Sequence, residues 1–452
     1  MKFHLLQRKY KFGPKVTVNL FLFILLPCQV HLVNSIKSDN NNNNNIENSY
    51  NQNKEFLREF NMAKEQFAKN SNLFGADLYK ELATDPKENV VFSPLSIQTC
   101  LSMVYMAAEG RTYEEIGNVL KYGPQGNKQE VAKAFQDILD DTEKESGLEI
   151  ANRIYVMSNY KLKAAFNELT AKHFKSAVES LDFAKRVDSA KAINTWVEEK
   201  THNKIKDLIS PDNLDELTRA VLVNAIYFKG KWLYPFDKRM THPSPFWVTP
   251  EQSIDVDMMT IKKRFKYGAL EKFDATALEM EYKDSNISML FILPNKKDGL
   301  KEFEEKMHAL DLKEIDGLMH HQEVEVFLPK FEFEFTKELN NVLVKLGMST
   351  AFSNAADFSG LLESPEPLKI SKVIHKAFIK VDEEGAEAAA ATAVLVRLKK
   401  SCRMFDERIK FAVDHPFYFA IQQRKDEALF PLFSGSVQIL PESQGKQEHD
   451  EL

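Results

Sequence analysis

Two short, almost uninterrupted apolar runs constrain the fold of this chain most. They are Ala220–Phe228 (AVLVNAIYF) and Met289–Leu293 (MLFIL). Runs of this length without polar alternation are typical of strands buried on both faces. Such strands need a layer of structure above and below them, so the chain must build a large sheet whose middle is covered on both sides.

Other segments predict the rest of the architecture. The apolar residues Val324, Val326, Phe331, Phe333 and Phe335 alternate with Glu and Lys, with an interruption at Pro329, as in strands with one face in water. Leu95–Ala108, which we expect to end near Gly110, and Ser189–Lys204 have helical spacing. Helices dominate the first half and strands the second. We therefore predict an α+β domain built on large, mostly antiparallel sheets.

The composition is that of one globular protein. The chain has 452 residues, of which 43% are hydrophobic and 28% charged, and no long Pro/Gly linker divides it after Ser71. We expect a single domain over 71–441. The net charge of −6 comes from 60 basic and 66 acidic residues spread along the chain. No basic field argues for a nucleic-acid partner.

The N-terminal segment resembles an export signal. Basic residues precede the apolar run Val16–Leu26, which is too short to span a membrane. We predict a signal peptide over 1–35, cleaved after Ser35, and no membrane insertion; a buried N-terminal helix is the alternative. The polar tract Asn40–Asn45 predicts a flexible leader over 36–70.

The chain ends in His449-Asp450-Glu451-Leu452. An HDEL terminus is read by a receptor as an endoplasmic-reticulum retrieval address. Together with the signal peptide, it predicts a lumenal protein with a tail over 442–452 and an HDEL receptor as partner; secretion is the alternative. Cys100 and Cys402, which remain after Cys28 leaves with the signal, could pair on count alone.

The sequence contains no G-x-S-x-G elbow, H-E-x-x-H pair, phosphate-binding loop or dinucleotide fingerprint. We predict no enzyme activity, no metal and no cofactor. His320-His321 precedes a strand and is better explained as a solvated turn than as a metal site. His375 lies in the apolar stretch Ile370–Val381, where a hydrogen-bonded core histidine is favoured over a catalytic base.

A small-residue segment near the C-terminus has two interpretations. Glu383–Ser401 (EEGAEAAAATAVLVRLKKS) is rich in helix formers. Read with a period of two, one of its faces is small and nearly apolar and the other carries the charges, as in a strand. No proline interrupts it. The pattern alone leaves an Ala-rich helix and a central strand both open.

The segment Glu383–Ala393 (EEGAEAAAATA) resembles the hinge of an inhibitory serpin's reactive-centre loop, and the likeness extends over roughly Leu73 to Leu440. Further matches follow in the family's order: Phe92–Ile97 (FSPLSI), Val223–Trp232 (VNAIYFKGKW), Leu328–Phe331 (LPKF), Ala356–Gly360 (ADFSG) and His415–Phe417 (HPF). The chain is identified as a member of this family. The resemblance implies three β-sheets, eight to nine helices and an exposed reactive-centre loop over about 383–405.

The resemblance also implies a mechanism. A serine protease cuts the loop, and the freed segment enters the central sheet as a new strand before the protease can finish its reaction. The implied hinge residues are Glu383, Gly385, Ala386, Glu387, Ala388, Ala389, Ala390, Ala391 and Thr392. Ser93, Ser96, Asn224 and His375 would form a polar "shutter" under the sheet, and Trp232 would cap its top.

The family's usual spacing puts the cleaved bond after Lys399, which lies 14 residues beyond Gly385. The reactive bond would be Lys399–Lys400, or Lys400–Ser401 in the alternative register. A Lys before the cut implies a trypsin-like protease, in a covalent complex with a monomeric inhibitor. In the alternative register Arg397 lies three residues upstream of Lys400, as convertases such as furin require.

Other roles stay open. A non-inhibitory serpin acting as a chaperone in the endoplasmic reticulum would suit the HDEL tail, although no bulky hinge residue supports it. The segment Lys128–Glu145, where the heparin-binding helix of the family should fall, is not basic. Asn286-Ile287-Ser288 is a single N-glycosylation sequon, so we expect a glycoprotein.

Overall fold

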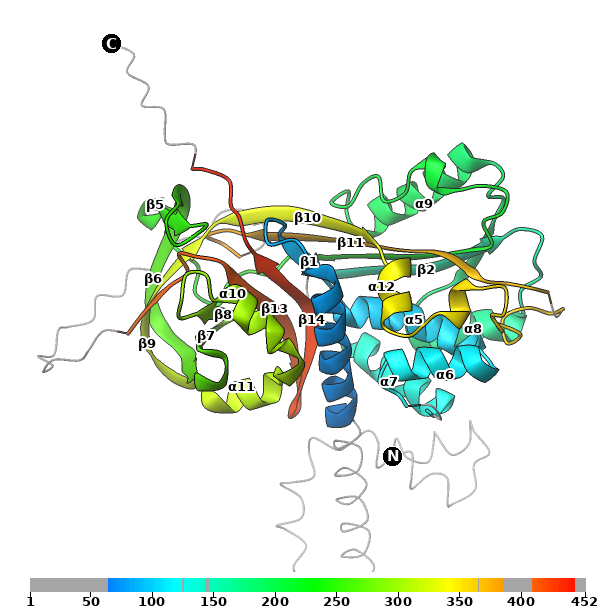
Figure 1. Ribbon diagram of the computed structural model, residues 1–452, viewed down its shortest axis with the longest axis horizontal. Helices are drawn as coiled ribbons and strands as arrows, with labels where there is room; N and C mark the ends of the chain where they lie inside the picture. The colour runs from blue at the N-terminus through cyan, green and yellow to red at the C-terminus, as the bar shows by residue number, and fades with distance from the viewer. Residues whose placement is uncertain (1–63, 124–125, 143–146, 365, 386–408, 444–452) are drawn as a thin grey trace, which may run out of the picture. The chain divides into compact units, whose positions relative to one another are not determined.

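The computed structural model describes residues 64–123, 126–142, 147–364, 366–385 and 409–443. These residues form two hydrogen-bonded sheets with helices packed against them (Figure 1). The predicted α+β class is confirmed.

The first sheet has five strands, in the order β10-β11-β4-β2-β3. Their bounds are β10 Phe331–Glu338, β11 Ile370–Val381, β4 Ala220–Phe228, β2 Leu148–Met157 and β3 Val178–Leu181. All nine residues of β4 are buried, because strands flank it on both sides and α5 packs against it. The apolar run Ala220–Phe228 is thus a central strand, as predicted.

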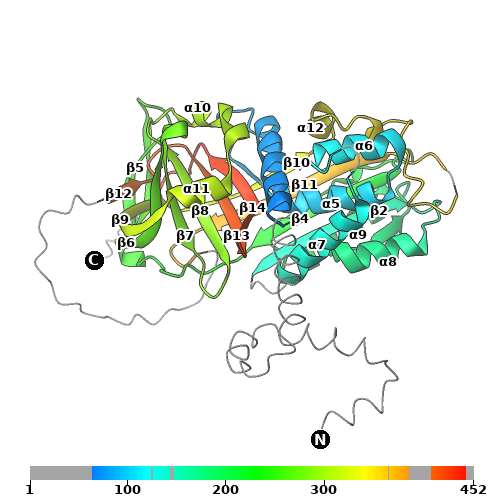
Figure 2. The same cartoon turned by 90° about the horizontal axis from the view of Figure 1, so that it is seen from below.

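The second sheet has nine strands, in the order β1-β14-β13-β8-β7-β6-β9-β12, with β5 paired to β6. The bounds are β1 Val90–Phe92, β14 Ala428–Val437, β13 Phe417–Lys425, β8 Ile287–Pro294, β7 Ala275–Glu281, β6 Ser253–Leu270, β9 His320–Pro329, β12 Ile409–Ala412 and β5 His242–Trp247. The 18-residue β6 is long enough to pair with β7 at one end and with β5 and β9 elsewhere (Figure 2). Because β6 connects these strands into one ladder, the described residues form two hydrogen-bonded sheets where the family resemblance implies three.

Nine α-helices occur among the described residues. They are a helix over 64–82, α5 Pro94–Ala107, α6 Gly110–Val119, α7 Lys128–Thr142, α8 Ala164–Phe174, α9 Arg186–Lys200, α10 Leu300–Glu305, α11 Leu312–Leu318 and α12 Asn340–Lys345. Figure 1 shows α9 on one side of the five-stranded sheet and α5 to α8 on the other.

Helix α5 and its N-cap carry Ser96 and Ser93, two of the residues predicted to lie under the sheet. Every residue of α5 is buried, as in a helix that is packed on all sides. The side chain of Ser93 caps its first turn by accepting a hydrogen bond from Ser96 N, and Pro94 occupies the first turn, where its missing N–H costs nothing. This start fixes both serines beneath the sheet.

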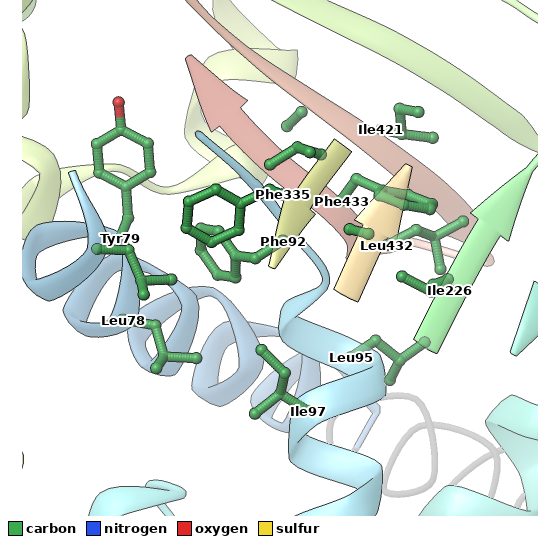
Figure 3. Packing of buried hydrophobic residues seen from close by; sticks show 14 of the residues in the cluster. Leu78, Tyr79, Phe92, Leu95, Ile97, Ile226, Phe335, Ile421, Leu432 and Phe433 are labelled. Atoms are coloured by element: carbon green, nitrogen blue, oxygen red, sulfur yellow. The ribbon is translucent and has the colours of Figure 1, made fainter. Parts of the chain in front are cut away.

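The hydrophobic core lies between α5, the 64–82 helix and the sheets. Figure 3 shows Leu95 of α5 beside Ile226 of β4, with Leu432 and Phe433 of β14 close by, and Ile97 of the same helix pointing away from β4. All five side chains are fully buried. This packing holds the five-stranded sheet against the helix that carries the two serines.

Two predicted boundaries were wrong. The folded part begins inside the expected leader, because the helix over 64–82 buries Phe67 and Ala68 in the core. Gly110 does not cap the preceding helix: α5 ends with Ala108 as its C-cap, and Gly110, with φ of 54°, begins α6. His320 and His321 are exposed, as expected, but they lie in β9 instead of a turn.

Candidate functional site

The central feature of the five-stranded sheet is a parallel seam. Strands β11 and β4 pair in parallel, from Ile370↔Ala220 to Phe378↔Tyr227. Their other neighbours, β10 and β2, are antiparallel to them. A strand running opposite to β11 and β4 could bond to both if it entered between them, since antiparallel pairing satisfies either edge.

A tight turn follows β11 at the head of this seam. Asp382 N donates to Gly385 O at 3.0 Å, and Gly385 N donates to Asp382 O at 3.3 Å. The turn places Gly385 in a bridge with Lys231, which follows β4. The chain after β11 is therefore reversed directly above the two parallel strands.

Only glycine fits at position 385. Its φ is +120°, a conformation that residues with a side chain rarely adopt. A Cβ atom there would also approach Lys231 Cα and Trp232 N to 2.8 Å each, and Gly230 O more closely still. The predicted hinge glycine is thus required by backbone conformation and by space.

Trp232 anchors this turn. Its backbone N donates to Glu384 O and its indole Nε1 to Asp382 O, both at 3.0 Å. The indole is buried and stacks on Tyr282 with ring centroids 4.5 Å apart. Trp232 therefore ties the end of β11 to the segment that follows β4, at the end of the sheet where the family resemblance implies it.

Two carboxylates secure the same turn. Glu383 is buried, accepts from the Thr241 hydroxyl at 2.8 Å and pairs with Lys330 Nζ at 3.2 Å. Burial alone would raise the pKa of Glu383, but its hydrogen bonds and the Lys330 charge outweigh burial and hold this pKa below its ordinary value. Glu384 pairs with the exposed Lys238 at 2.6 Å.

A second polar group, the seam cluster, lies under the middle of the seam. It consists of Ser93, Ser96, Asn152, Asn224 and His375, all buried. His375 and Asn224 face each other across the parallel pair, and His375 Nδ1 bonds to Asn224 Oδ1. Asn224 Nδ2 donates to Ser96 Oγ at 2.6 Å and also to Asn152 Oδ1. The cluster thus ties β11, β4, β2 and α5 together.

These contacts define the state of His375. Its Nε2 accepts from Ser93 N at 3.3 Å, so the ring proton sits on Nδ1 and is donated to Asn224. Burial lowers the pKa of His375 to about 3, because a charged imidazole loses its hydration there. The ring is therefore neutral at physiological pH and belongs to the core, which favours the structural interpretation of this histidine.

The structure adds residues that the sequence analysis missed. Asn152 completes the seam cluster, and Lys330 and Thr241 hold Glu383. Lys330 belongs to the LPKF stretch, which by itself does not indicate a contact with Glu383. A polar Asn in the mostly apolar stretch Leu148–Met157 was the one signal that could have drawn attention to position 152.

Several predicted residues lie outside the described residues. These are the hinge residues Ala386, Glu387, Ala388, Ala389, Ala390, Ala391 and Thr392, the reactive-bond candidates Lys399, Lys400 and Ser401, and Arg397, together with Cys402 and the HDEL tail. Cys100 is buried in α5, where burial raises the pKa of its thiol to about 12. Asn286 is exposed between β7 and β8.

Within the ranges given above, no group of three or more His, Cys, Asp or Glu side chains is placed to hold a metal ion. None of the helices in that part of the chain combines the length and apolar character needed to cross a membrane.

The fold and the site together define a class: an α+β protein with a parallel seam in its central sheet and a glycine hinge above it. A family model described as "Serpin (serine protease inhibitor)" matches residues 69–438. The chain belongs to the serpin family.

The relatives support the same assignment. Ipis-1 of Ixodes persulcatus is 39% identical over 375 residues, which cover 81% of this chain and 97% of that protein. Serine protease inhibitor 42Dd of Drosophila melanogaster is 39% identical over 350 residues, or 76% of this chain and 91% of the relative. The solved structure of cleaved Serpin 42Da has a TM-score of 0.76 and 44% identity, and covers 84% of this chain and 100% of its own.

Proposed function

We propose that this protein traps trypsin-like serine proteases as a suicide substrate. The observation that carries the proposal is the parallel seam between β11 and β4, with the turn at Gly385 directly above it. A segment continuing downward from Gly385 would run antiparallel to both strands. Insertion would replace one parallel ladder by two antiparallel ladders, which are somewhat more stable per residue.

The chemistry would start at the exposed loop. The protease's serine oxygen attacks the carbonyl carbon of Lys399, the bond to the Lys400 nitrogen breaks, and that amine leaves with a proton. An ester then joins Lys399 to the protease. Insertion of the freed segment would carry the ester-linked protease away from the loop's original position and distort its active site before water can cleave the ester.

The seam cluster would act as the gate. Insertion has to separate β11 from β4, and it must therefore break the hydrogen bond between His375 and Asn224. A buried, fully paired cluster resists spontaneous opening, because its members would lose their partners. The predicted shutter role of Ser93, Ser96, Asn224 and His375, and the capping role of Trp232, belong to this proposal.

The proposal is tested by mixing the protein with trypsin and separating the products under denaturing conditions. We expect a covalent 1:1 band that is absent with trypsin whose catalytic serine is replaced by Ala. Mass spectrometry of the released C-terminal peptide identifies the bond: a start at Lys400 supports Lys399 as the cleaved residue. Cleaved chain together with fully active trypsin would overturn the proposal.

The target could also be a furin-like convertase, since Arg397 then occupies the upstream basic position of the Lys400–Ser401 register. The same gel with furin distinguishes the two, and a peptide starting at Ser401 supports this register. We further propose that the HDEL terminus keeps the protein in the endoplasmic reticulum. Deleting His449–Leu452 should then release it into the medium, and equal secretion with and without the tail would refute retention.

A further inference from the structure

A cavity lies beside the N-terminal half of β2. Strand β3 pairs with β2 only from Ile154 to Met157, so the stretch Leu148–Arg153 has no neighbouring strand on that side among the described residues. Helices α7, α8 and α9 lie near this part of the sheet (Figure 2), and side chains from all three line the gap. The cavity has a volume of about 510 Å³, within the range of small-molecule sites.

One wall of the cavity is apolar. Leu139 of α7, Leu148 of β2 and Phe174 of α8 line it, and all three side chains are buried. Trp196 of α9 adds an aromatic face. These side chains would favour a hydrocarbon or aromatic body over water.

The polar side of the cavity carries donors and positive charge. The indole Nε1 of Trp196 is buried and has no hydrogen-bond partner among the described residues, which is rare for a buried N–H. The guanidinium of Arg153 lies over the Trp196 ring, 4.1 Å from its centroid. Lys175 and Lys200 also line the cavity.

The carboxylates near the cavity are engaged. Glu149 lines it and bonds to His202 at 3.1 Å. Outside the lining, Glu179 pairs with Arg153 and Asp140 with Lys175, each at 2.5 Å. Of the three lining cations, Lys200 alone has no carboxylate partner among the described residues, since Arg153 and Lys175 are paired as above. An anionic group is the natural partner for the unpaired indole N–H in a lining that carries these cations.

We propose that this cavity binds a small amphipathic carboxylate. Its apolar body would lie against Leu139, Leu148 and Phe174, and its carboxylate would accept the Trp196 N–H and face Arg153. Both a fatty acid and an aromatic acid have this chemistry. No lining residue belongs to the expected reactive-loop segment, so the proposal does not depend on the proposed inhibition of proteases.

Calorimetric titration of the full chain with decanoate and with indole-3-acetate tests the proposal and shows which kind of body the cavity prefers. We expect one site for at least one of the two acids. The uncharged 1-decanol and indole-3-ethanol should bind at least about tenfold more weakly than the matching acid, because they lack the charge that strengthens the hydrogen bond. Equal affinity of acid and alcohol would overturn the carboxylate assignment, and no binding of either acid would overturn the site.

Variants locate the site. Trp196→Phe keeps an aromatic ring but removes the N–H, and should weaken binding about tenfold. Trp247→Phe, in β5 and outside the cavity lining, is the matched control and should bind like the parent. If Trp196→Phe does not fold, Lys200→Ala at the exposed rim replaces it and should weaken binding a few-fold. Unchanged affinity in the folded cavity variant would refute the placement.

Discussion

The turn above the seam and the seam cluster below it hold the same two strands in different ways. Above, Glu383 and Glu384 are held by lysines, one of them exposed, and by backbone hydrogen bonds to the segment that follows β4. Below, every member of the cluster is buried and the histidine is neutral. The seam is therefore secured at its head by charge and backbone conformation, and at its middle by hydrogen bonds between buried neutral groups.

The largest effect should come from breaking the lower region. His375→Ala removes the partners of Ser93 N and Asn224 Oδ1 and leaves a void, so it should lower the free energy of unfolding by about 3 kcal/mol. The midpoint of urea unfolding measures this. Lys372→Ala on the same strand, which loses only a partly exposed ion pair with Glu338, should cost less than about 1 kcal/mol. Equal losses of stability in both variants would show that the seam cluster contributes no more than a partly exposed ion pair on the same strand.

The upper region should be next in size. Gly385→Ala forces a side chain into a φ of +120° and against the Lys231–Trp232 backbone, which should cost about 1–3 kcal/mol. Gly317→Ala is the matched control, because a Cβ there meets nothing within 4 Å and Ala favours the helix it lies in. It should leave stability unchanged or raise it. An unchanged free energy of unfolding in Gly385→Ala would mean that the turn can rearrange to accommodate a side chain without cost.

The two regions should lose their contributions to stability at different pH values. The folded-state pKa of His375, about 3, lies below its ordinary value of 6.5. Between these two pH values, His375 is therefore protonated only in the unfolded chain. Stability should therefore fall as pH drops below 6.5, by up to about 1.4 kcal/mol per unit. The pKa of Glu383 is also lowered, but from 4.5, so its contribution is lost only below that pH.

Urea unfolding at pH 6.5, 5.5 and 4.5 isolates the His375 effect from that of the hinge. The variant His375→Gln keeps an amide donor and acceptor but cannot titrate, and its slope with pH should be smaller than that of the parent. Identical slopes in parent and variant would assign the acid sensitivity to other groups.

The smallest effects should come from the charges of the turn. Glu383→Gln removes one half of the pair with Lys330, and should lower stability by about 1 kcal/mol, with less effect in high salt. Lys238→Ala removes an exposed partner of Glu384 and should change unfolding too little to measure. A larger loss of stability in Lys238→Ala than in Glu383→Gln would contradict the argument that the more buried ion pair contributes more.

Much of the fold could be predicted from local patterns. The run Ala220–Phe228 became β4 with the same bounds, since burial on both faces leaves a nearly unbroken apolar signature. The mostly apolar stretch Ile370–Val381 became β11, also with the same bounds. The class of the fold followed from the order of helices and strands. The start of the domain was misplaced because the segment before Ser71 is mostly polar, and the burial of Phe67 depends on tertiary packing.

The site was less predictable, for a physical reason. Gly385, Trp232 and His375 could be singled out through the family resemblance, but their partners depend on strand register. Asn152 reaches the seam cluster because it pairs with Asn224 across β2 and β4, and Lys330 meets Glu383 from 53 residues away in sequence. No local pattern encodes such pairings.

The glycine at the head of the seam has a genetic consequence. A single base change that replaces glycine yields only a chiral amino acid or a stop codon, and every chiral replacement carries the Cβ atom that position 385 excludes. The neighbouring Glu383 and Glu384 are held by side chains, so a conservative replacement at either would weaken the turn only in part. In a saturation library selected for correctly folded protein, we therefore expect position 385 to be nearly invariant and both glutamates to vary.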